Sequence, residues 1–246
     1  MNLDTKIGLE IRSLTFYSGC ILGLILFSGI ASLLIPFLNA EKRQYVFSRY
    51  NVFVIWWSEF ICGVHYKIEG LNNIPEGACV VLSNHQSSLE TFLLQTLFSP
   101  LSTVLKQELL KIPFFGWGAK ILEPIALDRR RPTQAYKQLI AQGQERIDQN
   151  RSVLIFPEGT RVSIGEKVKF NRGGAALAYH TQAPIIPIAH NAGLRWTSRR
   201  LLLPGTVTVR IGKPIHPAAM NKKELYDEST KWIETNRDNL MASMAS

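Results

Sequence analysis

A histidine and a carboxylate, His85 and Glu90, stand at a fixed spacing directly after the short apolar run 79–82. A neutral imidazole can take a proton from a hydroxyl group near pH 7, and a carboxylate on its other nitrogen fixes the tautomer and stabilises the imidazolium. The pair therefore indicates general-base chemistry on an oxygen nucleophile. The spacing Ser87-x-x-Glu90 also satisfies a helix capping box, in which Glu90 reaches back to a backbone N–H group. The motif by itself fits both interpretations.

A second segment, residues 156–161 (Phe-Pro-Glu-Gly-Thr-Arg), continues the strand-like run 152–155. It joins a turn-forming glycine, Gly159, to Arg161, whose planar guanidinium group suits phosphate. An isolated hexapeptide of this kind is more typical of a strand that ends in a turn with a solvated arginine. It is not isolated here, because the same chain also carries the His85 and Glu90 motif, and this combination favours a functional site.

Together the two segments resemble the motifs of the glycerolipid acyltransferase family, whose first motif is Asn-His-x-x-x-x-Asp. Residues 106–116 with 125–129 are similar to the second motif of that family, and residues 186–188 are similar to its fourth. Four motifs in order, spread over residues 74–214, are far more specific than one. The resemblance implies transfer of a fatty acyl group to a glycerol-phosphate acceptor. We expect the acceptor to be lysophosphatidic acid and the product to be phosphatidic acid.

The chain departs from the family pattern at two places. Glu90 stands where the family usually has Asp, so the carboxylate has one more methylene, and we expect its role to survive. After the third motif the family often has Phe-Lys-x-Gly, whereas this chain has Phe170-Asn171-Arg172-Gly173. Arg172 is therefore expected to supply the missing charge.

The expected mechanism is direct acyl transfer from a thioester donor, either acyl-CoA or acyl carrier protein. His85 removes the proton from the acceptor hydroxyl while Glu90 orients the imidazole. The chain lacks Gly-x-Ser-x-Gly, so Ser87 and Ser88 are not expected to act as nucleophiles. Backbone N–H groups near the helix start after His85 are candidates for stabilising the oxyanion.

The expected substrate-binding residues come from the second and third motifs. By resemblance, and by bidentate guanidinium chemistry, Arg161, Arg129 and Arg172 hold the acceptor phosphate. Glu158 and Thr160, with Gly159, are expected to shape the substrate-binding turn.

Metal and cofactor chemistry are not expected. His85 and Glu90 could supply two ligands, but a catalytic zinc normally has three protein ligands and no third partner stands out. The other histidines have no acidic residue at the same spacing, so structural or surface roles are expected for His65, His180, His190 and His216. Two alternatives to the leading function stay open: acylation of another lyso-lipid such as a lyso-ornithine lipid, and a non-catalytic lipid-binding membrane protein.

Composition favours a lipid partner. The chain has 246 residues, enough for a sizeable core, and a net charge of +9, which favours anionic partners. No zinc-finger spacing, basic heptad helix or aromatic RNA-binding signature is present, so a nucleic-acid partner is not expected. The cysteines are odd in number and not closely paired, which fits a reducing cytoplasmic face: Cys20, Cys62 and Cys79.

The N-terminal region predicts a membrane anchor. Residues 14–38 carry no charge. This uncharged segment is long enough for a transmembrane helix and too long for the apolar region of a signal peptide. Gly19, Gly23, Gly29 and Pro36 leave open a segment that bends and returns instead of crossing. Basic residues flank both ends, which favours both ends, and the catalytic domain, on the cytoplasmic face.

Residues 45–66 are rich in aromatic side chains, which suits either the headgroup level of a bilayer or a helix packed on the catalytic domain. We therefore divide the chain into an anchoring helical region, 1–66, and a catalytic domain, 67–246.

From residue 68 onward short apolar runs alternate with helical stretches. Strands are predicted at 79–82, 103–105, 125–127, 153–156, 185–188 and 206–211, and helices at 133–149 and 222–240. The alternation predicts an α/β domain with a mixed sheet and flanking helices. Active sites in such sheets commonly lie at strand ends, which is where His85 and Glu158 are expected.

Overall fold

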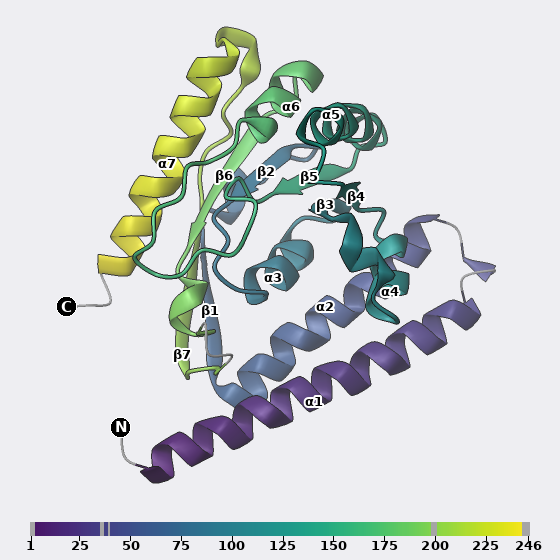
Figure 1. The fold of residues 1–246 in the computed structure, drawn as a ribbon, viewed down its shortest axis with the longest axis vertical. Helices are drawn as coiled ribbons and strands as arrows, with labels where there is room; N and C mark the ends of the chain where they lie inside the picture. Colours follow the sequence, from purple (N-terminus) through teal and green to yellow (C-terminus); the bar gives the residue numbers. More distant parts are fainter. Residues whose placement is uncertain (1–2, 35–36, 39, 198–200, 243–246) are drawn as a thin grey trace.

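The fold is one mixed sheet covered by helices on both faces. A computed structural model describes residues 3–34, 37–38, 40–197 and 201–242. Its sheet has seven strands in the order β1-β7-β6-β2-β5-β3-β4. Two long N-terminal helices lie along one side of the molecule (Figure 1). The predicted fold class, an α/β domain after an N-terminal helical segment, is confirmed.

Five neighbouring strands run parallel: β6 (Ile185–His190), β2 (Val80–Ser83), β5 (Ser152–Ile155), β3 (Leu101–Lys106) and β4 (Ile125–Leu127). Next to them β7 (Gly205–Ile211) pairs antiparallel with β6, and β1 (Val64–Glu69) pairs parallel with β7. Because β2 and β5 are parallel and adjacent, the residues that follow them reach the same edge of the sheet. This edge is where the candidate site lies.

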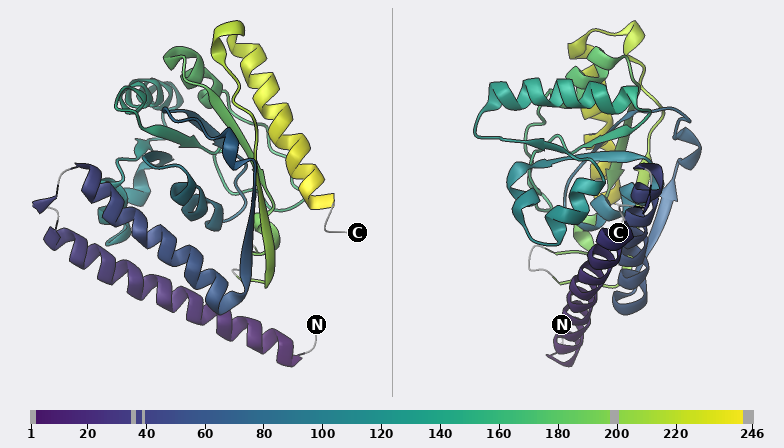
Figure 2. Two further views of the ribbon diagram at one scale, coloured as in Figure 1. Left: turned by 180° about the vertical axis from the view of Figure 1, so that it is seen from behind. Right: turned by 90° about the vertical axis from the view of Figure 1, so that its right-hand side faces the viewer.

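Alternate residues of the central strands face two separate cores. Val81 of β2 and Leu154 of β5 pack on one side with helix α3 (Leu89–Leu97) and the N-terminal helices. Val80 and Val153 pack on the other side with α5 (Pro132–Asp148), α6 (Gly173–Thr181) and α7 (Lys222–Ala242). Figure 2 shows these two layers on opposite sides of the sheet. Burial on both faces explains why the central strands read as continuous apolar runs.

Helices α1 (Leu3–Leu34) and α2 (Ala40–Cys62) form a hairpin. They approach closely because Gly19 and Gly23 leave room for Trp57 and Phe53 of α2. These glycines therefore serve packing, and α1 continues through both without a bend. By length and composition α1 could cross a membrane over Thr5–Ile30, but part of that span, including Phe16, is buried inside the protein.

The aromatic side chains of α2 divide between the two predicted environments. Phe53 and Trp57 pack against the core, whereas Trp56 and Phe60 are exposed. The packed pair confirms that α2 lies against the catalytic domain, and the bilayer interpretation of the exposed pair stays a prediction.

The predicted elements agree with β2 to β7, α5 and α7 to within two residues at each end. Strand β1 was not predicted, and the proposed division at residues 66 and 67 falls inside it. Gly63, with φ of +66°, ends α2, and β1 follows at Val64. A glycine just after a helix is a common stop signal, and it places the start of the sheet domain at Val64.

Candidate active site

His85 follows β2, and its ring is oriented by Glu90 in the first turn of α3. The two atoms His85 Nδ1 and Glu90 Oε1 are 2.9 Å apart. An ionised carboxylate only accepts hydrogen bonds, so Nδ1 carries the proton and Nε2 keeps a lone pair. The ring also stacks on Phe156, with centroids 4.0 Å apart and an interplanar angle of 18°. His85 therefore has the tautomer and support of a general base.

Glu90 is held by several donors. Its Oε1 accepts hydrogen bonds from the backbone N–H groups of Gln86 at 2.8 Å and Ser87 at 2.7 Å, and its Oε2 accepts one from Ser87 Oγ. Burial alone would raise the pKa of Glu90, but the adjacent rings of His190 and His85 and the hydrogen bonds from His85 and Ser87 lower it below its usual range. Glu90 is therefore ionised at neutral pH.

The same carboxylate orients the base and makes one half of a capping box, although the N-cap of α3 is Ser88 and Ser87 Oγ accepts from the Leu89 N–H group. The bond from the Ser87 N–H group is that of a capping box, and the bond from His85 is that of a base-orienting acid. The longer side chain of Glu90 reaches both. The N–H groups of Gln86 and Ser87 donate to Glu90. These two groups are therefore not available to stabilise an oxyanion, the role expected for N–H groups near the helix start.

The turn after β5 supports the backbone of His85. Oε1 of Glu158 accepts a hydrogen bond of 3.2 Å from the His85 N–H group, and the Val162 N–H group donates to the His85 carbonyl at 2.8 Å. Gly159 has φ of +72°, a conformation that favours glycine at this turn. Oε2 of Glu158 is buried and has no hydrogen-bond partner in the described part of the chain. Burial raises the pKa of Glu158 to about 7.

Two of the predicted arginines lie beside His85. Arg161 Nη2 donates to Ser88 Oγ at 2.6 Å, and Arg129 Nη1 donates to the Gly159 carbonyl. Burial lowers the pKa of Arg129 from its ordinary value. Both arginines and Thr160 line the same cavity as His85.

The structure does not bring Arg172 to this cavity. Its guanidinium group lies 5.5 Å from the ring centroid of Tyr226 on α7, and the Tyr226 hydroxyl donates to the Phe170 carbonyl at 2.8 Å. This docking on α7 draws the segment around Arg172 away from the cavity lining. Its position gives no support to the phosphate role expected from the sequence.

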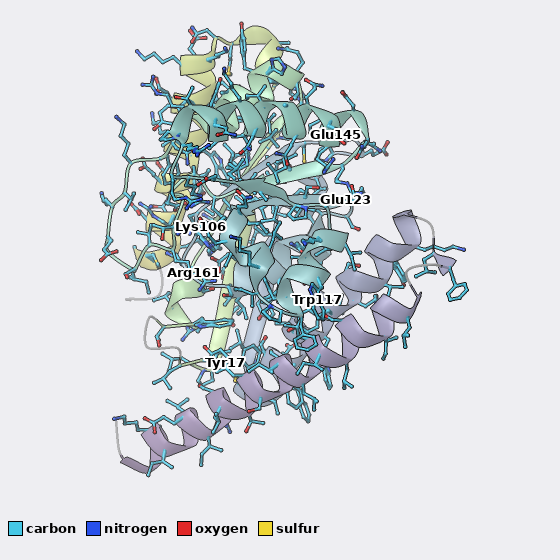
Figure 3. The ribbon with its side chains drawn as sticks, turned by 45° about the vertical axis from the view of Figure 1, so that its right-hand side comes forward. Tyr17, Lys106, Trp117, Glu123, Glu145 and Arg161 are labelled. Carbon is cyan, nitrogen blue, oxygen red and sulfur yellow. The ribbon has the colours of Figure 1, made fainter. Side chains whose placement is uncertain are left out.

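The cavity has a volume of about 450 Å³ and is lined by both ionisable and apolar side chains. His85, Arg129, Arg161 and Lys106 supply the ionisable lining. Figure 3 shows Lys106 and Arg161 on the same side of the molecule. Lys106 is exposed and lies at the end of β3, and it was not expected as a site residue although it opens the second motif.

Much of the remaining lining comes from helices that the sequence did not connect with the site. One face of α3 contributes Thr91, Phe92 and Gln95 at helical spacing. The remaining apolar lining comes from α1, α2, β3 and α4 (Phe115–Ile121) with its C-cap: Leu24, Phe27, Tyr50, Val104, Phe115, Ala119 and Leu122. The N-terminal helices are therefore part of the site as well as a candidate anchor.

The remaining histidines have the structural or surface positions that were expected. His65 is exposed and pairs with Glu59 at 2.7 Å, and His180 and His216 are exposed. His190 is fully buried, with both ring nitrogens hydrogen-bonded. Among the described residues no three His, Cys, Asp or Glu side chains are grouped as metal ligands.

Comparisons with known proteins agree with this geometry. The model of a family described as Acyltransferase matches residues 65–191, more than half of the chain. A Pseudomonas aeruginosa protein named 1-acyl-sn-glycerol-3-phosphate acyltransferase is 42% identical over 228 residues, covering 91% of this chain and 89% of that protein. A mouse protein named 1-acyl-sn-glycerol-3-phosphate acyltransferase alpha is 30% identical, covering 82% of this chain and 70% of that protein.

A solved structure has the same fold. The crystal structure of the 1-acyl-sn-glycerophosphate (LPA) acyltransferase from Thermotoga maritima matches with a TM-score of 0.81 and 23% identity. The match covers 96% of this chain and 98% of that one. It therefore includes the N-terminal helices as well as the sheet.

Proposed function

This chain belongs to the acyltransferase family, and from that premise we propose that it transfers a fatty acyl group to 1-acyl-sn-glycerol-3-phosphate, giving phosphatidic acid. The observation that carries the proposal is the His85–Glu90 pair, whose Nδ1 to Oε1 distance is 2.9 Å, in a cavity lined by basic and by apolar side chains. A substrate with a phosphate group and a fatty chain matches both kinds of lining. The names of the relatives support the same acceptor.

The chemical step uses His85 as the base. Nε2 of His85 takes the proton of the acceptor hydroxyl as that oxygen attacks the thioester carbonyl of the acyl donor. The C–S bond then breaks, and the proton held by His85 passes to the departing thiolate. Glu90 offsets the positive charge of the imidazolium between these two proton transfers. The donor is an acyl thioester, acyl-CoA or acyl carrier protein.

Arg161 and Arg129 bind the acceptor phosphate. Arg161 now donates to a neutral partner, the Ser88 hydroxyl, which an anionic phosphate can replace with a stronger charge-assisted hydrogen bond. Arg129 is held against Gly159, so the turn that supports His85 also fixes one phosphate ligand. This link sets the distance between the phosphate and the reacting hydroxyl.

The fatty chain of the donor or acceptor packs against the apolar lining of the cavity. Phe92 and Phe115 belong to this lining together with Leu24 and Phe27 of α1. Burying a methylene group contributes about 0.8 kcal/mol, so a long chain gains substantial binding energy there. Helix α1 lines the cavity and also carries exposed apolar side chains. A fatty chain that enters along α1 would therefore come from this exposed apolar side of the molecule.

We place that side on the cytoplasmic surface of a membrane. Large apolar side chains of α1, including Leu22 and Leu26, are exposed, and they are joined by Trp56 of α2 and Trp117 of α4. Figure 3 shows Trp117 beside the N-terminal helices. An apolar surface of this kind, with exposed tryptophans, suits the interface of a bilayer.

The experiment is an assay of purified protein with lysophosphatidic acid and acyl-CoA, with acyl carrier protein as a second donor. We expect phosphatidic acid from the wild type, and His85→Ala should reduce turnover by about 10²- to 10⁴-fold. Turnover with a lyso-ornithine lipid but not lysophosphatidic acid would overturn the acceptor assignment. Lipid binding without turnover would identify a non-catalytic protein.

A further inference from the structure

His190, the last residue of β6, lies directly behind the peptide bond that leads into His85. Its ring is fully buried, and Nε2 is 2.6 Å from the carbonyl oxygen of Asn84. Nδ1 accepts a hydrogen bond of 3.2 Å from the Ala192 N–H group. Because Nδ1 accepts, the proton is on Nε2, and Nε2–H donates to Asn84.

The Asn84–His85 peptide group is consequently held by side chains at both ends. Its carbonyl oxygen accepts from His190 at 2.6 Å and, at the longer distance of 3.2 Å, from Ser83 Oγ, and its N–H group donates to Glu158 Oε1 at 3.2 Å. Anchoring both ends fixes the plane of the peptide, and that plane sets the direction of the bond from Cα to Cβ in His85.

Further bonds join the same two segments. The Asn84 side chain donates to the His190 carbonyl at 3.0 Å and accepts from the His190 N–H group at 3.0 Å. The Gly193 N–H group donates to Gln86 Oε1 at 3.1 Å. The segment after β6 therefore contacts the first motif on both sides of His85.

We propose that His190 is a positioning residue for acyl transfer, because its Nε2–H group anchors the peptide carbonyl that sets the orientation of the His85 ring. This inference rests on the proposed function, since it concerns the base of that reaction. His190 Nε2 is also 4.0 Å from Glu90 Oε1, so the anchor lies immediately beside the carboxylate that His85 uses. His190 is absent from the cavity lining, and therefore it acts through His85 and not on the substrate.

The role predicts a split between kcat and KM. A base displaced by about 1 Å can lose roughly 10²-fold in rate. The substrate contacts of Arg161 and Arg129 do not involve His190, so both KM values should stay unchanged. A residue that only filled space would change the stability of the fold without this selective effect on kcat.

Three substitutions separate the N–H anchor from packing. In His190→Gln the amide N–H group can reach the position of Nε2, whereas in His190→Asn the shorter side chain reaches only the position of Nδ1. His190→Met has the length of glutamine without a donor. We expect the Gln variant to restore most of the wild-type kcat, and the Asn and Met variants to lose about 10- to 100-fold in kcat at unchanged KM.

The measurements are steady-state kinetics for donor and acceptor, with the melting temperature of each variant in detergent. Equal losses in all three variants, unchanged kcat in Asn and Met, or a change confined to KM would overturn the proposal. The proposal would also be overturned if only the Gln variant folded, because His190 would then be needed for folding and not specifically for catalysis. Each variant is compared with the wild type on whichever acceptor the wild type uses. If the wild type does not turn over lysophosphatidic acid, the proposed function is refuted, but the role of His190 can still be tested on the other acceptor.

Discussion

Glu158 and His85 are joined through the backbone, since Oε1 of Glu158 accepts a hydrogen bond of 3.2 Å from the His85 N–H group. The other carboxyl oxygen is buried without a hydrogen-bond partner in the described ranges. Burial raises the pKa of Glu158 to about 7, whereas its ordinary value is 4.5. A support of the catalytic base is therefore a group that titrates near neutral pH.

The first prediction concerns pH and stability. Between pH 4.5 and about 7 the folded protein keeps a proton on Glu158 that the unfolded chain has lost. The contribution to stability is therefore complete below pH 4.5 and falls as the pH rises to about 7, by at most about 3 kcal/mol. Glu158→Gln is neutral at every pH, so its stability relative to the wild type should increase from pH 5 to pH 8. Urea unfolding in detergent measures this difference, and a constant difference would contradict the raised pKa.

The second prediction concerns the acid of the pair. Glu90→Gln keeps the shape of the side chain but not its charge, so kcat should fall by about 10²- to 10⁴-fold. The exposed pair of Glu59 and His65, with a distance of 2.7 Å, offers a matched control, and Glu59→Gln should leave kcat unchanged. Steady-state rates of the two variants decide the matter. Comparable losses in both would mean that the Glu90 charge has no special role.

The third prediction compares two arginines. Arg161→Ala removes a charge-assisted hydrogen bond worth about 1.5–3 kcal/mol, so the KM for lysophosphatidic acid should rise by at least about 10-fold. Arg172→Ala should leave that KM unchanged, because Arg172 lies over Tyr226 outside the cavity lining. The acceptor KM of each variant is measured at saturating donor. A larger effect from Arg172 would restore the assignment expected from the sequence.

The fourth prediction concerns the membrane surface. Deleting α1 would also remove Leu24 and Phe27 from the cavity, so point substitutions are the sharper test. Leu22→Gln with Leu26→Gln should weaken binding to lipid vesicles by about 100-fold or more, because each leucine contributes about 1.5–3 kcal/mol when buried. Tyr136→Gln, at an exposed position on α5 across the sheet, is the control. Vesicle sedimentation at low and high salt measures binding, and equal retention of both variants would place the anchor elsewhere.

The sequence by itself determined the features that depend on local spacing. His85 and Glu90 are five residues apart across a strand end and the first turn of a helix, so their contact at 2.9 Å needs little long-range information. The alternation of apolar runs and helical stretches likewise predicted an α/β domain, and the central runs are continuous because β2, β5 and β6 are buried on both faces of the sheet. The same pattern placed His85 and Glu158 directly after predicted strands, and the structure adds that these strands, β2 and β5, are parallel neighbours.

Only the tertiary structure decided which distant residues meet. Arg161 and Arg172 are both arginines near the third motif, yet packing of one on Tyr226 and the other beside Ser88 separates them. His190 lies 106 positions after Asn84, and no acidic residue follows it at the spacing that marks His85. The adjacent parallel strands β2 and β6 nevertheless place its ring against the Asn84–His85 peptide group. Contacts of this kind depend on strand order and register, which local propensities do not encode.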